Sequence, residues 1–423
     1  MVSLVALITV CVMVWALIKK YETRMVLIAG GLVLACVAGD PMATLKSFSA
    51  SMKQANVFEV IVACMGFAAV VKLTGCHNHL IGLFVKVLRK CGPFTIMGAA
   101  LATMVVNSAI PSAAGTSAAV GTILIPLLIA AKVPAPIAAA TIMAGLYGGN
   151  LNPGHVHPTI VAELAGKTGF DFVAISAAPI VSSVVCSSIV LIGLSYYMRR
   201  KGLYADINVE EGEGGLPSDF RPNVILAIIP LLPLIMLLLG NMGVVKALKM
   251  PVSHAMIIGA VVAMIATRTN PAAITKEFFK GMGSSFGNIF GIIVAANIFV
   301  AGLKSCGIIA ELIDYMTGAP GIAKIASIVG PFFVVILSGS GEAASIAFNN
   351  AVTAHAESFG LDIMNMGCMT VLSGGIGRSI SPVAGAMIIC AGLAKVSPMT
   401  VTRWIVLPML CALACVTLML YVF

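Results

Sequence analysis

The sequence predicts an all-α membrane protein with about ten transmembrane helices and two re-entrant hairpins, arranged in two repeats of inverted topology. Three observations support this prediction. The 423 residues are 60% hydrophobic and only 10% charged, whereas soluble domains carry about 25% charged residues. Two segments from opposite halves of the chain share sequence, and several apolar stretches are too short or too interrupted to be simple crossings.

Simple crossings are expected where about 20 apolar residues follow one another. We predict them at residues 2–18, 25–40, 57–75, 172–198, 223–242, 252–267, 284–303 and 400–421. Trp15 and Trp404 lie near the ends of the first and last of these runs, as interfacial anchors do. The first run ends in Lys19 and Lys20 without a small-residue cleavage site, so we expect a retained helix.

Two apolar regions contain polar and glycine-rich turns. Residues 93–131 are broken within MVVNSAIPSAAGTSAAV and residues 320–354 within VVILSGSGEAASIAF, and each arm beside a break has roughly 15 residues. Such arms predict re-entrant hairpins, whose irregular backbone is tolerated only inside protein or beside a cavity. Two further stretches, 146–158 and 372–382, combine glycine, proline and polar residues and predict discontinuous helices.

An internal repeat relates the two halves. NVFEVIVACMGFAAVVKLTG (56–75) and NIFGIIVAANIFVAGLKSCG (288–307) share nine of twenty positions without gaps. The first repeat covers residues 1–198, a polar linker covers 199–222, and the second repeat covers 223–423. Five crossings per half is an odd number, so the second repeat is inverted relative to the first.

Charge predicts the orientation. Most of the 25 Lys and Arg residues fall on one side if both termini are outside and the linker 199–222 is cytoplasmic. The net charge of +9 therefore reflects membrane orientation, and no nucleic-acid partner is expected. The short run Cys76-His77-Asn78-His79 lacks a clear fourth ligand and is typical of a polar helix end, so no metal site is predicted.

Inverted repeats with discontinuous helices are typical of secondary transporters, whose site lies near the middle of the membrane. We expect four segments to meet there: 107–115, 146–158, 338–345 and 373–382. The predicted substrate-binding residues are Asn107, Ser108, Ser112, Asn150, Asn152, His155, Ser338, Ser340, Gly341, Glu342, Arg378, Ser379 and Ser381.

Arg378 indicates what binds. A buried guanidinium is expensive in a membrane, and its planar fork suits a carboxylate. An anionic substrate accounts for it, and an internal ion pair with Glu342 or Glu163 is the alternative. Glu342 and His157 are candidates for carrying a coupling proton or cation, H⁺ or Na⁺. No other cofactor is expected.

Enzymatic motifs are missing from the sequence. It has no zinc helix of the HExxH type, no P-loop and no GxSxG elbow. The chain is therefore not expected to be an enzyme. A membrane-embedded hydrolase using Glu342 and the histidines is the less favoured alternative, and a channel is disfavoured by the blocked hairpins.

SGSGEAASIAF, GGIGRSISPVAGAMIICAGLAKVSP and GMGSSFGNIFGIIVAANIFVAGLKSCG resemble segments of the DcuC-type four-carbon dicarboxylate carriers, within the larger ion transporter superfamily. The resemblance implies exchange or cation-coupled transport of succinate, fumarate, malate or aspartate across a bacterial inner membrane. It also implies a homodimer with scaffold and transport regions and elevator-type movement. Family members carry a small amide residue where this chain has Glu342, which keeps another organic acid or an amino acid open as substrate.

Overall fold

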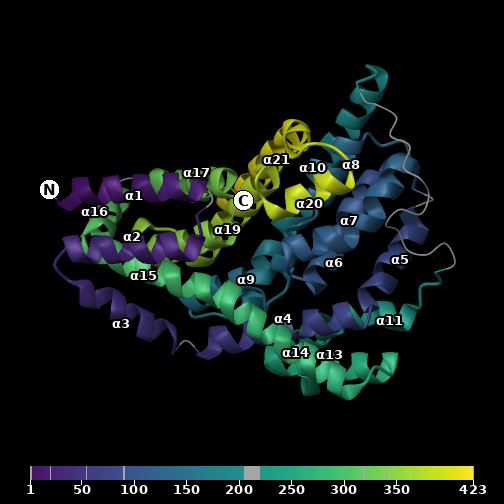
Figure 1. Cartoon of the computed structure of the whole chain (residues 1–423), viewed down its shortest axis with the longest axis horizontal. Coiled ribbons are helices and arrows are strands. Elements are labelled where there is room, and N and C mark those ends of the chain that lie inside the picture. The colour runs from purple at the N-terminus through teal and green to yellow at the C-terminus, as the bar shows by residue number, and fades with distance from the viewer. Residues whose placement is uncertain are drawn as a thin grey trace.

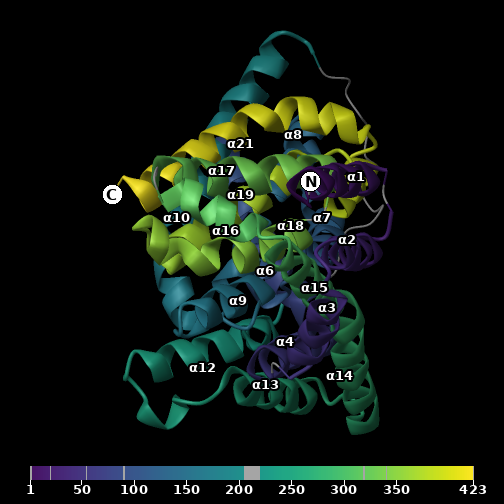
Figure 2. The same cartoon turned by 90° about the vertical axis from the view of Figure 1, so that its left-hand side faces the viewer.

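The computed structural model describes residues 2–19, 21–53, 55–88, 91–203, 220–317, 320–339 and 341–422. Every regular element in these ranges is a helix (Figures 1 and 2). Among the described residues, six helices are long and apolar enough to cross a membrane, or up to eight if two sharply bent helix pairs count as one span each. The prediction of an all-α, multi-pass membrane protein is therefore confirmed, and the count of ten crossings stays a prediction.

The first half contains ten α-helices and two short 3₁₀ segments in the described residues. They are α1 Val2–Ile18, α2 Thr23–Val37, α3 Pro41–Ser51, α4 Ala55–Leu73, α5 Cys76–Leu88, η1 Gly92–Phe94, α6 Thr95–Ala109, α7 Ala113–Ala130, α8 Ala135–Ala144, η2 Gly148–Leu151, α9 Val156–Leu164 and α10 Gly169–Arg200.

The second half begins after the linker. Its elements are α11 Val224–Ile228, η3 Ile229–Leu231, α12 Leu232–Asn241, η4 Lys246–Leu248, α13 Val252–Thr267, α14 Pro271–Ser285, η5 Phe286–Phe290, α15 Gly291–Ser305, α16 Ile308–Thr317, α17 Pro320–Ser338, α18 Gly341–Ala351, η6 Thr353–Phe359, α19 Ile363–Ile380, α20 Gly385–Leu393 and α21 Pro398–Tyr421.

Four of these helices were not predicted: α3, α5, α14 and α16. They are short and interleaved with polar residues, so no crossing-length apolar run marks them. Local sequence signals nevertheless explain where α3 and α14 begin. The Asp40 side chain accepts a hydrogen bond from the Ala43 amide and is followed by Pro41. The Asn270 side chain accepts one from the Ala272 amide and is followed by Pro271. A capping side chain followed by proline at the first helical position favours a helix start.

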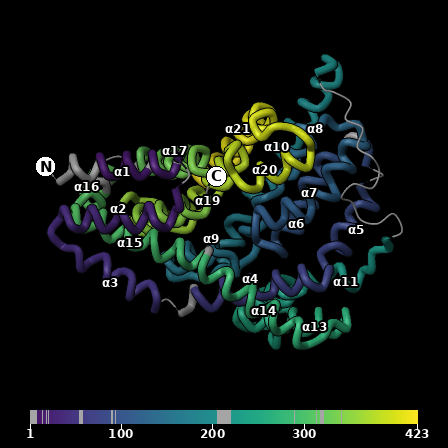
Figure 3. Tube along the Cα trace, in the orientation of Figure 1, coloured from purple at the N-terminus to yellow at the C-terminus, as the bar shows by residue number. Residues whose placement is uncertain are grey.

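Helices α8 and α19 lie deepest in the protein. All ten residues of α8 are buried, as is most of α19. Helices α10 and α21 pack against each other and against these two, while α2, α3 and α15 form the opposite end of the molecule (Figures 1 and 2). Helices α13 and α14 pack on α4 (Figure 3). The polar segments of both halves are thereby brought together around α8 and α19.

The structure corrects one predicted break. Residues 372–380 are not a break but the last turns of α19, and the helix ends only before Pro382. The glycines are accommodated by close packing: a Cβ at Gly377 would lie 2.6 Å from the Phe332 carbonyl oxygen, and one at Gly374 would lie 2.3 Å from Ser345 Oγ. Tertiary packing thus overrides the low helix propensity of glycine, and the residue before proline ends the helix.

Candidate functional site

The first component of the site is the turn between α6 and α7. Ser112 Oγ accepts a hydrogen bond of 3.2 Å from the Gly115 amide and caps α7. Thr116 Oγ1 donates to the Ile110 carbonyl at 2.8 Å. These bonds satisfy backbone groups that the interruption at 110–112 would otherwise leave unpaired in a buried region.

Two asparagines join this turn to the irregular segment after α8. Asn107 Oδ1 accepts a hydrogen bond of 2.6 Å from the Gly149 amide. In the other direction, Asn152 Nδ2 donates to the Ser108 carbonyl at 2.9 Å. Each asparagine therefore belongs to one segment and satisfies backbone of the other, and the two segments form one unit.

Helix α19 brings the guanidinium to the end of α8. Arg378 Nη2 donates to the Leu146 carbonyl at 3.0 Å, and Ser379 Oγ donates to the Met143 carbonyl at 3.2 Å. The last carbonyl groups of a helix lack intrahelical partners and carry partial negative charge. The end of α8 thus offsets part of the desolvation cost of the arginine.

The turn between α17 and α18 is the last component. Gly339 has a φ of 73°, in the left-handed region that favours glycine. A Cβ at Gly341 would lie 3.5 Å from Arg378 Cδ, so the start of α18 packs on the arginine stem. Ser381 Oγ donates to the Ile336 carbonyl at 2.8 Å and ties this hairpin to α19.

These four segments enclose a cavity of about 20 Å³, enough for about one water molecule. It is lined by Asn107, Pro111, Ala113, Leu146, Gly149, Asn150, His155, His157, Gly341, Glu342, Val371, Gly375 and Arg378. Ala113 begins α7, Gly341 begins α18 and His155 is the N-cap of α9. Three helix N-termini therefore border one cavity, an arrangement that favours an anion.

Several buried polar atoms in the cavity lack a hydrogen-bond partner among the described residues. They are Asn150 Oδ1, His155 Nδ1, His157 Nδ1 and Arg378 Nε. The two imidazole rings lie 5.3 Å apart between centroids. Because buried polar groups are nearly always paired in native proteins, this cluster indicates a binding place for a small polar molecule.

Glu342 and Arg378 line this cavity but make no salt bridge with each other in the described part of the chain. The alternative in which Arg378 is neutralised by a direct ion pair is therefore not seen. Both groups line the same small cavity, so one positive charge and one carboxyl group border a shared space.

Seven predicted site residues line the cavity: Asn107, Asn150, His155, His157, Gly341, Glu342 and Arg378. Five others do not; Ser108, Ser112, Asn152, Ser379 and Ser381 instead hydrogen-bond to backbone. Ser338 borders a separate apolar cavity. Ser340 lies outside the described residues.

Sequence reasoning missed Val371 as a lining residue and Thr116 as the support of Asn107. Val371 is one apolar residue among many in α19, so the sequence contains no signal for it. Thr116 donates to Ile110 and accepts from Asn107 Nδ2 at 3.1 Å. Its place within the predicted break, directly after Gly115, was the available signal.

Comparisons with known proteins agree with this architecture. A family model, DcuC: C4-dicarboxylate anaerobic carrier, matches residues 33–423. An uncharacterized transporter of Haemophilus influenzae is 38% identical over 264 residues, which cover 60% of this chain and 93% of that protein. The anaerobic C4-dicarboxylate transporter DcuC of Escherichia coli K12 is 24% identical and covers 95% of this chain and 92% of its own length.

A solved structure has a similar fold. The YdaH transporter of Alcanivorax borkumensis, whose topology is described as unusual, superposes with a TM-score of 0.64 at 14% identity. The match covers 89% of this chain and 87% of that one. At this identity the likeness shows the fold alone.

Proposed function

The chain belongs to the C4-dicarboxylate anaerobic carrier family, DcuC, and from this premise we propose that it moves four-carbon dicarboxylates across a bacterial inner membrane by secondary active transport. The family is one of carriers rather than enzymes. The observation that carries the choice of substrate is the cavity around Arg378, where a guanidinium and three helix N-termini meet unpaired imidazole and amide atoms.

The chemistry of the cavity fits a small acid. Arg378 keeps Nε unpaired while Nη2 is used by Leu146, so a carboxylate can bind beside the fixed hydrogen bond. Asn150 Oδ1 has no partner among the described residues and can accept a hydrogen bond from a hydroxyl or protonated group of the substrate. Each imidazole can donate through one ring nitrogen, and the N-termini of α7 and α18 supply partial positive charge. Succinate, fumarate, malate and aspartate are the substrates that we expect.

Glu342 is the proposed coupling group. A dianion beside an ionised Glu342 is unfavourable, so the carboxyl takes up a proton or binds a cation such as Na⁺ when the substrate binds. His157 borders the same space and is the second candidate. The alternative is that the Glu342 carboxylate binds an amine group of the substrate. The substrate would then be an amino acid or another zwitterion.

Alternating access is supported by the recurrence of elements. Each half contains a bent helix pair, then a hairpin, then an interrupted helix and finally a long helix. In the first half these are α4–α5, α6–α7, α8–α9 and α10, and in the second half they are α15–α16, α17–α18, α19–α20 and α21. Helix α3 packs on α15, and α14 packs on α4, so each half covers the other. This order matches the inverted repeats proposed for residues 1–198 and 223–423.

The cavity is smaller than a four-carbon acid, so binding requires one hairpin to move. The α17–α18 hairpin has space beside it, since it lines one side of an apolar cavity of about 360 Å³ whose other walls come from α1, α2 and α15. We assign it the role of gate within an elevator-type movement of the site-bearing helices. Outside termini, a cytoplasmic 199–222 linker and a homodimer complete the proposal.

Counterflow in proteoliposomes tests the function. Vesicles loaded with succinate, fumarate, malate, aspartate, a monocarboxylate or a neutral amino acid are mixed with labelled succinate, with and without a proton or sodium gradient. Accumulation driven only by internal four-carbon diacids supports the proposal. Equal counterflow with a neutral amino acid would move the assignment to the zwitterion alternative, and no counterflow with any acid would reject it.

A further inference from the structure

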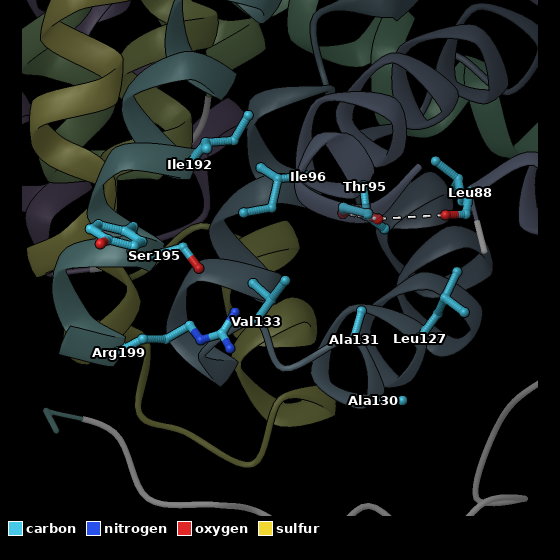
Figure 4. Close-up of a pocket in the computed structure, with 12 residues that line it drawn as sticks. Leu88, Thr95, Ile96, Leu127, Ala130, Ala131, Val133, Ile192, Ser195 and Arg199 are labelled. Atoms are coloured by element: carbon cyan, nitrogen blue, oxygen red, sulfur yellow. Dashed lines mark hydrogen bonds between the residues drawn. The ribbon is translucent and has the colours of Figure 1, made fainter. Parts of the chain in front are cut away.

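A second and larger cavity, of about 600 Å³, lies apart from the candidate site. It is bounded by the base of the α6–α7 hairpin, the end of α5 and the last turns of α10 (Figure 4). The substrate pathway proposed above does not use it. Its walls differ from those of the Arg378 cavity because apolar side chains cover most of them.

Apolar side chains from four helices line the cavity. Leu88 comes from α5, Ile96 from α6, Leu127 from α7 and Ile192 from α10, with Val133 closing the base (Figure 4). A cavity with such walls favours hydrocarbon over a freely soluble ion.

Polar groups gather on the α10 side. Arg199 and Ser195 point into the cavity (Figure 4). Ser195 is only 6% exposed, and neither its hydroxyl nor the Arg199 guanidinium has a hydrogen-bond or salt-bridge partner among the described residues. No Asp or Glu occurs among the described lining residues, and Lys132 is adjacent in sequence to two of them. The cavity therefore has net positive charge.

The depth of the cavity is that of lipid headgroups. Helix α10 has 32 residues and is about 48 Å long at 1.5 Å per residue, longer than the roughly 30 Å hydrocarbon layer. Its last turn, with Arg199, consequently reaches the interface. Helix α5, which ends at Leu88, is bent by 70° from α4 at the break between Leu73 and Cys76.

From these observations we propose that the cavity binds one anionic phospholipid. The phosphate accepts hydrogen bonds from the Arg199 guanidinium and the Ser195 hydroxyl, and one acyl chain lies along Ile96, Leu127 and Ile192. Anionic lipids are attracted to basic residues at the membrane surface, and a guanidinium recognises phosphate with charge-assisted hydrogen bonds. The lipid would join the hairpin base to α10 and stabilise their packing.

The test uses the full-length protein, purified and stripped of lipid in detergent. Phosphatidylglycerol, phosphatidylcholine and glycerol 3-phosphate are added separately, and the melting temperature and the lipid retained in native mass spectrometry are measured. Phosphatidylglycerol should raise the melting temperature and remain bound, whereas the other two should do neither. If phosphatidylcholine has the same effects as phosphatidylglycerol, the proposed requirement for a negatively charged ligand is wrong. If glycerol 3-phosphate has the same effects, the proposed ligand is not a lipid.

Variants locate the site. Arg199→Gln should weaken phosphatidylglycerol binding about ten-fold or more, since it removes a charged hydrogen-bond partner. Arg200→Gln is the matched control, because Arg200 follows on the same helix but is not among the lining residues, and its binding should be unchanged. Ala131→Trp should also block binding by filling the space, which keeps the test decisive if Arg199→Gln folds poorly. Undiminished binding in both Arg199→Gln and Ala131→Trp would overturn the proposal.

Discussion

Arg378 and Leu146 lie 232 positions apart in the chain, and Nη2 of the arginine donates a hydrogen bond of 3.0 Å to the leucine carbonyl. This bond places the guanidinium just beyond the C-terminal end of α8, which ends at Ala144, and the helix dipole is negative at that end. It uses one edge of the guanidinium only. Arg378 Nε has no partner in the described part of the chain, so the arginine is held in place while part of its fork remains available to a substrate.

The first prediction concerns this arginine. Arg378→Ala should reduce succinate counterflow at least about 100-fold, because two or more charge-assisted hydrogen bonds to the substrate are lost. Arg378→Lys should also be strongly impaired, since an ammonium lacks the planar fork. Folding is checked by the melting temperature and by size-exclusion chromatography in detergent. Arg403→Ala, which removes an exposed arginine from α21, serves as the control, and near-normal counterflow by Arg378→Ala would remove this residue from the site.

The second prediction concerns coupling through Glu342. Glu342→Gln should flatten the pH dependence of uptake driven by a proton gradient, because the amide cannot gain or lose a proton. Exchange of internal for external substrate should persist, since exchange needs no net proton movement. Uptake is measured between about pH 5.5 and 8, with His157→Gln as the parallel variant. A pH profile identical to that of the unmodified protein would exclude Glu342 and leave His157 as the candidate.

Much of the candidate site was predictable because polar residues are costly inside a membrane. Arg378, Glu342 and the two histidines stand out in apolar sequence, and all four line the cavity. The serines were less predictable. Hydroxyl groups in buried helices can bond to a nearby carbonyl group instead of a ligand, as Ser108 does with Val105 at 2.7 Å.

Some helix boundaries were likewise predictable from the sequence and others were not. Turns flanked by short apolar arms can be read from the order of residues, whereas the continuity of α19 through GGIG cannot. It depends on the close approach of Phe332 to Gly377, which is a tertiary contact with no local signature. Short helices such as α5 also escape prediction, since their 13 residues lack an apolar run of crossing length.

The third prediction concerns stability and pH outside the membrane spans. Glu22 is the N-cap of α2; it accepts hydrogen bonds from the Arg24 side chain and, at 2.7 Å, from the Met25 amide. Partial burial raises the pKa of Glu22, but the hydrogen bonds from Arg24 and Met25 outweigh it and lower the pKa overall. A lowered pKa stabilises the fold above the unfolded-state value of about 4.3 and loses this effect as the pH falls through the folded-state value.

Glu22→Gln should therefore lower stability at pH 7 by up to about 1 kcal/mol, a modest amount because the ion pair is exposed to solvent. The difference from the unmodified protein should shrink as the pH falls below about 4. Melting temperatures measured in detergent across this range test the sign. Glu357→Gln, at another exposed glutamate, is the control. A difference that grows toward low pH would contradict the prediction.

The fourth prediction uses two glycines with opposite surroundings. A Cβ at Gly148 would lie 1.9 Å from the Met104 carbonyl oxygen, whereas one at Gly193 would meet nothing within 4 Å. Gly148→Ala must push η2 away from α6 and disturb the adjacent bond between the Gly149 amide and Asn107 Oδ1. We expect a loss of about 1–3 kcal/mol of stability, as for other overpacked sites, together with a large loss of transport.

Gly193→Ala should be neutral or stabilise the protein by up to about 1 kcal/mol, because alanine is the better helix former and α10 is continuous there. The pair is compared by melting temperature and by succinate counterflow in the same proteoliposomes. Equal behaviour of the two variants would mean that η2 and α6 are not packed as closely as their backbones indicate. The hydrogen bond from the Gly149 amide to Asn107 depends on that packing. Equal behaviour would therefore also contradict the described positions of Asn107 and Gly149 in the wall of the Arg378 cavity.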